Sequence, residues 1–161
     1  MAPDTEAGRR PRTPDRDHVA AQVIVVGLDG SPSSWDAFSW AAGEAVRGNG
    51  TLVAVYVLPL VDSAAASFGV PYDFAGVAQA RQEVADELKR EACERAEELG
   101  VELSFVLEHG DATHVLNDIA REVHANLVVV GRSANVLHRL TGSLSRRLTS
   151  RNDAPVVVVV P

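Results

Sequence analysis

Five segments rich in apolar residues are spaced along the chain, and each is typical of a strand. Continuous runs such as "VIVVGLDG" and "TLVAVYVL" predict strands covered on both faces, because parallel strands packed between helices carry apolar side chains on both sides. The predicted strands are residues 23–30, 51–58, 101–110, 126–131 and 154–160.

The segments between them show helical periodicity and local end signals. Ser31 or Ser33 is placed to cap the first helix, Pro32 lies in its first turn, and the Gly-Asn-Gly cluster at 48–50 ends it. The positions expected to face the sheet are Trp35, Phe38, Ala42 and Val46 in this helix; Val77, Val84, Leu88, Ala92 and Leu99 in a helix over 76–100; Val115, Ile119 and Val123 in a helix capped by Asp111; and Leu144 and Leu148 in a short helix before the last strand.

The alternation of strands and helices predicts an α/β fold, namely a single-domain, open, five-stranded parallel sheet with helices on both faces. Right-handed crossovers place the turn after every strand at the same carboxyl edge, where ligands of open α/β sheets bind. The candidates at this edge are Asp29, Gly30 and Ser31, the chain after Val57, the run 109–111 and the segment from Gly131.

Composition narrows the class of protein. The 161 residues, 46% hydrophobic and 23% charged, are those of one globular domain, and a net charge of -7 argues against nucleic acid as a partner. No apolar run approaches the roughly 18 residues of a membrane span, and no signal-peptide core precedes the domain, so no membrane partner and a cytoplasmic location are expected. Cys93, the only cysteine, is expected to be a small buried hydrophobe.

Residues 1–20 differ from the rest of the chain. They mix proline, arginine and acid without periodicity, and four arginines offset three aspartates and one glutamate. This pattern predicts a disordered N-terminal tail ahead of a domain over residues 21–161.

The segment from Gly131 combines glycines with positive charge. A loop after a buried strand leads to Gly142 and Ser143 at the start of a helix, where free backbone N–H groups favour anions. The alternative is that Gly131 only ends a strand and Ser143 only caps a helix, and the spacing leaves both interpretations open. Residues 131–151 contain no acid and five arginines, which are Arg132, Arg139, Arg146, Arg147 and Arg151.

Other constellations are less informative. Asp29 either accepts a hydrogen bond from a sugar hydroxyl or anchors the turn to Gly30. It has no second acid beside it, and Lys89, the only lysine, lies on an acidic helix, so a receiver-type phosphoacceptor site is not expected. The spacing of the histidines and Asp111 over 109–124 matches no tight zinc arrangement. No nucleophile is accompanied by a base, so an enzyme is not expected.

Two stretches together resemble the universal stress protein family. They are "VIVVGLDGSPSSWDAFSWA" at one end and "LVVVGRSA…TGSLSRRLTSRNDAPVVVVVP" at the other, and the resemblance extends from Gln22 to Pro161. It implies the adenine nucleotide alpha hydrolase-like fold, ATP binding, homodimers and a role in stress response. Asp29 would contact the ribose, Val57 the adenine, and Gly131 the sugar and phosphates. The residues implied for nucleotide binding are Asp29, Val57, Gly131, Arg132, Gly142, Ser143, Leu144 and Ser145.

The chain departs from the ATP-binding pattern of that family, which is glycine, two residues, glycine, nine residues, then Gly-Ser or Gly-Thr. Ala134 replaces the second glycine, and only seven residues separate it from Gly142. Two hypotheses therefore stand, a nucleotide-responsive protein and a nucleotide-free dimeric adaptor. A related adenine-nucleotide hydrolase is disfavoured, because no Ser-Gly-Gly-x-Asp-Ser loop is present. The valine-rich last strand, expected at an edge of the sheet, favours homodimers through that strand.

Overall fold

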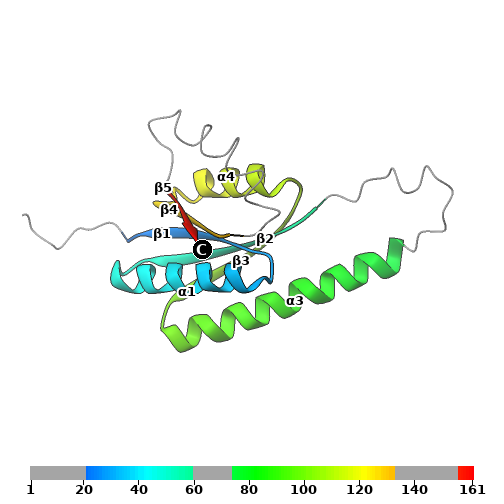
Figure 1. The fold of residues 1–161 in the computed structure, drawn as a ribbon, viewed down its shortest axis with the longest axis horizontal. Coiled ribbons are helices and arrows are strands. Elements are labelled where there is room, and N and C mark those ends of the chain that lie inside the picture. Colours follow the sequence, from blue (N-terminus) through cyan, green and yellow to red (C-terminus); the bar gives the residue numbers. More distant parts are fainter. Residues whose placement is uncertain (1–20, 60–73, 133–155) are drawn as a thin grey trace, which may run out of the picture.

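Strands and helices alternate through the parts of the chain that the structure, a computed structural model, describes: residues 21–59, 74–132 and 156–161 (Figure 1). The predicted tail, the connection over 60–73 and the short helix around Leu144 and Leu148 lie outside these residues. The described elements are β1 (Val23–Leu28), α1 (Pro32–Arg47), β2 (Thr51–Leu58), α3 (Phe74–Leu99), β3 (Glu102–His109), α4 (Ala112–Glu122), β4 (Leu127–Gly131) and β5 (Val156–Val160).

The five strands form one parallel sheet in the order β3-β2-β1-β4-β5, which confirms the predicted fold class. β1 lies at the centre, where Val25 pairs with Val53 of β2 and with Val128 of β4. From β1 the chain first adds strands on one side, through β2 and β3, and then on the other, through β4 and β5. The strand order therefore reverses between β1 and β4.

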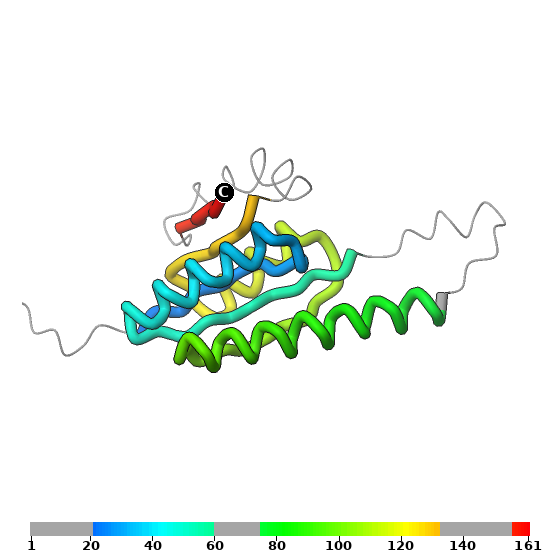
Figure 2. Tube along the Cα trace, turned by 60° about the horizontal axis from the view of Figure 1, so that its bottom comes forward, coloured from blue at the N-terminus to red at the C-terminus, as the bar shows by residue number. Residues whose placement is uncertain are grey.

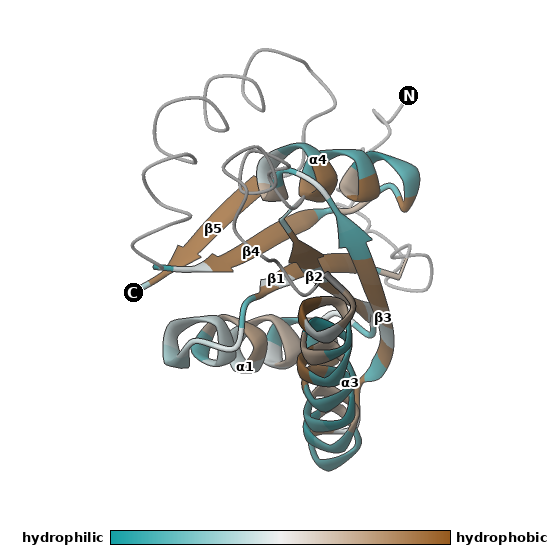
Figure 3. Cartoon of the chain, turned by 90° about the vertical axis from the view of Figure 1, so that its right-hand side faces the viewer, coloured by the Kyte–Doolittle hydropathy of each residue, from teal (hydrophilic) through white to brown (hydrophobic). Residues whose placement is uncertain are grey.

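Helices cover both faces of the sheet, as predicted. α1 and α3 pack on one face and α4 on the other, with the apolar sheet between them (Figure 3). α3 is the longest helix in the described part of the chain, and its N-terminal part extends beyond the sheet (Figure 2). The core on the α1 side is centred on Ile24, Val26, Phe38 and Leu52, and the core on the α4 side on Val25, Val55, Leu116 and Val128.

The faces that the helices present to the sheet were predicted only in part. In α4, Ile119 is buried and Val115 and Val123 pack around it, which confirms the prediction. In α1 the prediction for Val46 was wrong, because this side chain is 50% exposed. The helix contacts the sheet through Phe38 and small residues, which let its backbone approach closely. The buried residues of α1 are Ser34, Ala37, Phe38, Ala41, Ala42 and Ala45.

Alanines also define the contact of α3. Val84 and Leu99, both predicted to face the sheet, are exposed. The buried stripe is Ala85, Leu88, Ala92 and Ala96. Cys93 is only partly buried.

Candidate functional site

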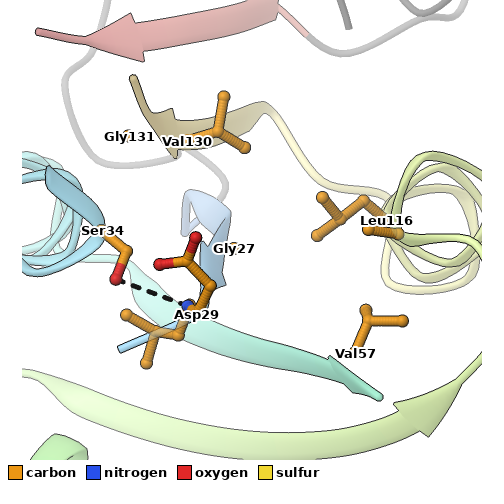
Figure 4. Close-up of a pocket in the computed structure, with 9 residues that line it drawn as sticks. Gly27, Asp29, Ser34, Val57, Leu116, Val130 and Gly131 are labelled. Carbon is orange, nitrogen blue, oxygen red and sulfur yellow. Dashed lines mark hydrogen bonds between the residues drawn. The ribbon is translucent and has the colours of Figure 1, made fainter. Parts of the chain in front are cut away.

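A pocket of about 110 Å³ opens between the carboxyl ends of β1 and β4, beside the first turns of α1 and α4 (Figure 4). Its position coincides with the reversal of strand order, which is where ligands of open α/β sheets bind. The residues that line it are Gly27, Leu28, Asp29, Ser34, Val57, Ala112, Leu116, Val130 and Gly131.

The turn from β1 into α1 is held by a set of short-range hydrogen bonds. The Asp29 carboxylate accepts the Ser31 N–H at 2.9 Å, across Gly30, whose φ of 80° favours glycine. Ser31 caps α1, because its Oγ accepts the Ser34 N–H at 3.2 Å, and Pro32 follows at the first helical position. Asp29 therefore anchors the turn, as one of its two sequence interpretations required, and it also borders the pocket.

Ser34 connects this turn to the pocket. Its side chain is buried, donates to the Ser31 carbonyl at 2.9 Å and accepts the Asp29 N–H at 3.4 Å (Figure 4). The hydroxyl is thus bonded within the turn, and it fixes the backbone of Asp29 relative to the first turn of α1.

Gly131 lies where β4 meets the first turn of α1. A Cβ atom at this position would collide with the backbone carbonyl of Ser33 and the backbone nitrogen of Ser34. The family resemblance implies that Gly131 contacts the sugar and phosphates of a ligand. In the described residues, the space beside Gly131 is occupied by the backbone of the first turn of α1.

The wall opposite Asp29 is apolar. Val57 at the end of β2, Leu116 of α4 and Val130 of β4 surround an open space (Figure 4). Leu116 and Val130 belong to the core of the α4 face, so the wall is continuous with a packed core. This combination, an apolar slot with a carboxylate at its rim, is suited to a flat ring that carries a polar substituent.

Two groups near the carboxyl ends of the strands, Tyr56 of β2 and Asp111 after β3, have shifted pKa values. Burial raises the pKa of the Tyr56 hydroxyl, Arg81 of α3 lowers it, and the Asp29 carboxylate raises it, with a net upward shift. Burial also raises the pKa of Asp111, but hydrogen bonds from the backbone N–H groups of His114 and Thr113 lower it more. Asp111 is the predicted cap of α4, and its Oδ1 accepts the Thr113 N–H at 3.0 Å.

In the described part of the chain, His109, His114 and His124 do not gather with acidic side chains around a common point. Among residues 21–59, 74–132 and 156–161, no group of three or more histidine, cysteine or acidic side chains could hold a metal ion. His114 instead lies beside the helix cap, with its Nδ1 3.2 Å from Asp111 Oδ1.

The structure brings together three of the residues implied for nucleotide binding. Asp29, Val57 and Gly131 lie at the carboxyl ends of three different strands and line one pocket. Arg132, the residue after Gly131, is exposed and does not line the pocket. Its backbone N–H donates to the Val160 carbonyl at 2.8 Å. The others, Gly142, Ser143, Leu144 and Ser145, lie outside the described residues, as does Ala134.

Sequence reasoning missed several residues of the lining. Gly27 gave a signal, since it interrupts the apolar run of the first strand. Nothing in the sequence distinguishes Leu116 and Val130 from the other apolar residues of their helix and strand. They lie at the pocket because α4 packs against the sheet there.

The parallel sheet, whose strand order reverses at its centre, defines a doubly wound α/β protein with a candidate ligand site at the pocket between β1 and β4. The family model described as "Universal stress protein family" matches residues 21–160, and the chain belongs to this family.

Individual relatives agree with this assignment. A universal stress protein of Mycobacterium tuberculosis is 33% identical over 152 residues, covering 84% of this chain and 47% of the relative, so the chain spans about half the length of the curated relatives it matches. The crystal structure of a family member from Burkholderia pseudomallei superposes with a TM-score of 0.69 at 28% identity, covering 88% of this chain and 96% of the other. A universal stress protein crystallised in complex with cAMP superposes with a TM-score of 0.58 at 26% identity, covering 87% and 96%.

None of the helices in the described ranges has both the length and the apolar composition to cross a membrane.

Proposed function

We propose that the chain binds an adenine nucleotide in the pocket between β1 and β4 and acts in the stress response through that binding. One observation carries the proposal: Asp29, Val57 and Gly131, which the family resemblance implies for nucleotide binding, line a single pocket at the reversal of strand order. The relative crystallised with cAMP supports the same ligand class.

Each part of the pocket suits one part of a nucleotide. The apolar wall of Val57, Leu116 and Val130 suits the adenine ring, and the Asp29 carboxylate suits a hydroxyl of the ribose. The phosphates would be held by the segment from Gly131, through Arg132, Gly142, Ser143, Leu144 and Ser145. We propose ATP as the nucleotide, because five arginines without an acid over 131–151 favour several phosphate charges. The chain would act as a binding protein and not as an enzyme.

We further propose that the protein forms homodimers through β5. This strand lies at an edge of the sheet and consists of five valines, of which Val156 is 62% and Val159 44% exposed. The opposite edge, β3, carries the charged residues Glu102 and Glu108. An apolar edge without charge favours pairing with a second copy, whereas charges on an edge oppose it.

Asp29→Asn tests the nucleotide proposal. The amide oxygen of asparagine can still accept the Ser31 N–H, so the turn is kept, but the charged hydrogen bond to the ribose is lost. We expect the affinity for ATP to fall roughly tenfold, the effect of about 1.4 kcal/mol. The measurement is isothermal titration of the full chain with ATP.

Asp36→Asn is the matched control, because Asp36 is exposed on α1 and does not line the pocket. It is expected to bind ATP with the wild-type affinity. Equal affinity of Asp29→Asn and the wild type would refute the assignment of Asp29.

The nucleotide-free adaptor remains the second candidate, and a specific feature favours it. Ala134 and a loop two residues short of the family pattern leave the phosphate-binding half of the signature incomplete. This alternative predicts that wild-type protein shows no saturable binding of ATP at millimolar concentration while it still dimerises.

A further inference from the structure

Trp40 is a large apolar side chain of α1 that is 38% exposed. The other tryptophan of this helix, Trp35, faces α3, because the Arg95 guanidinium lies 4.4 Å from the centre of its ring. Trp40 follows five residues later and lies about 140° around the helix from Trp35. Its neighbours Ala37 and Ala41 are buried, so Trp40 borders the face that packs on the sheet. It therefore lies on the side of α1 that is turned away from α3 and toward β5 (Figure 3).

Along the strand direction, Trp40 lies level with the middle of β5. The first turn of α1 gives the reference, because the Ser33 carbonyl lies beside Gly131, which pairs with Val160. From Ser33 to Trp40 the helix descends seven residues, which is about 10 Å. The same distance corresponds to about three residues of a strand. Counted down β5 from Val160, it reaches Val157.

The open edge of β5 has one register in which all five of its residues pair with a second copy. The Val156 N–H and the Val160 carbonyl are bonded on the β4 side. By alternation, the backbone groups of Val157 and Val159 face the open edge. Two-fold symmetry makes the pairing antiparallel, and the register that uses both of these residues sets Val158 opposite its own copy. The two-fold axis then passes beside Val158, whose side chain packs on the α1 face of the sheet.

Such a pairing leaves a groove over the α1 face of the joined sheets. α1 packs mainly on β1 and β4, so about two strand spacings separate it from the two-fold axis. The α1 helices of the two copies would then lie about 19 Å apart, whereas helices in direct contact lie about 8–10 Å apart. Among Ala37, Trp40 and Glu44, the residues of α1 that border this groove, only Trp40 is both large and apolar.

We propose that Trp40 anchors the homodimer interface by filling this groove, where it packs over the paired Val158 side chains and against its own copy. The inference rests on the proposed pairing through β5 and names a residue outside the strand that stabilises it. Tryptophan is enriched among the residues that dominate binding energy at interfaces. The charged residues nearby suit the polar rim of such an interface, since Asp36 is exposed and Glu44 is paired with Arg47.

Trp40→Ala tests the anchor. We expect it to raise the dissociation constant of the dimer at least tenfold, because the groove is left unfilled while β5 is unchanged. Trp40→Phe keeps an aromatic ring and is expected to fall between the wild type and Trp40→Ala. The measurement is sedimentation velocity of the full chain over a concentration series, with circular dichroism to verify that each variant is folded.

Tryptophan fluorescence gives an independent measurement. Dilution of the wild type through its dissociation constant is expected to shift the emission to longer wavelength, since Trp40 becomes exposed to water. Trp40→Phe is expected to lose this shift, because Trp35 stays packed beneath Arg95 in both states.

Val46→Ala is the matched control. Val46 is also exposed on α1, at 50%, but it lies three turns after Trp35 on the side of the helix that faces α3. This variant is expected to dimerise with the wild-type dissociation constant.

The outcomes separate this inference from the proposed function. A Trp40→Ala protein with the wild-type dissociation constant would overturn the role of Trp40 and leave the pairing through β5 intact. An equal loss in Val46→Ala would also overturn it, because the effect would then belong to α1 as a whole. A wild-type chain that is monomeric at every concentration would overturn this inference together with the proposed homodimer, whereas titration with ATP tests the nucleotide proposal separately.

Discussion

At the scale of single residues, two glycines border the same pocket in different surroundings. Gly131 is required by the fold, because the backbone of Ser33 occupies the place where its Cβ would lie. Gly27 has room for a Cβ and no backbone strain. The sequence presents both simply as glycines in or after an apolar run, and only the positions of α1 and α4 tell them apart.

Gly131→Ala is expected to destabilise the protein, since either β4 or the first turn of α1 must move. Overpacking of this kind costs about 1–3 kcal/mol, which corresponds to a fall in melting temperature of roughly 3–10 °C. Thermal unfolding without nucleotide measures it, with Gly43→Ala, a substitution in α1 outside the pocket lining, as the comparison. A melting temperature equal to or above that of the wild type would show that α1 does not pack against Gly131 in this way.

At the scale of elements, the starts of the helices could be predicted from neighbouring residues, whereas the helix faces that contact the sheet could be predicted only in part. Ser31 with Pro32, and Asp111, mark helix starts through hydrogen bonds to residues two or three positions away, and the structure confirms both. The prediction that Val46, Val84 and Leu99 face the sheet was wrong, because alanines form most of the buried stripes of α1 and α3. Close packing of α1 and α3 favours the alanine stripes, and this choice depends on the sheet as a partner.

The last strand offers an element-scale prediction about assembly. Along β5, the Val156 N–H donates to the Asn126 carbonyl, and the Val160 carbonyl accepts the Arg132 N–H, so the backbone groups of these two valines point toward β4. Because successive residues of a strand point their backbone groups to opposite sides, the N–H and C=O groups of Val159 face the open edge. We expect Val159→Lys to shift the protein from dimer to monomer, because a charged edge opposes strand pairing. Size-exclusion chromatography with light scattering measures the mass.

A matched control for this experiment is Val84→Lys. Val84 is 50% exposed on α3, far in sequence from β5, and the substitution adds the same charge. This variant is expected to remain a dimer. A Val159→Lys protein that also remains a dimer would exclude β5 as the interface.

At the scale of the whole molecule, the site depends on topology. Asp29, Val57 and Val130 are separated by long stretches of chain, and they meet because parallel strands end at one edge and the strand order reverses between β1 and β4. The parallel sheet and its shared carboxyl edge could be predicted from the apolar runs and the helices between them, but the spatial order of the strands was not predicted. The contribution of Leu116 could not, since it follows from the position of α4 over the sheet.

The central claim is that an adenine nucleotide occupies the space between Val57, Leu116 and Val130. Methyl resonances of valine and leucine, followed by NMR during a titration of the full chain with ATP, test it most directly. We predict saturable shifts for these three residues and none for the methyls of Val84 and Leu99, which are exposed on α3. Unchanged resonances of Val57, Leu116 and Val130 at millimolar ATP would contradict the claim.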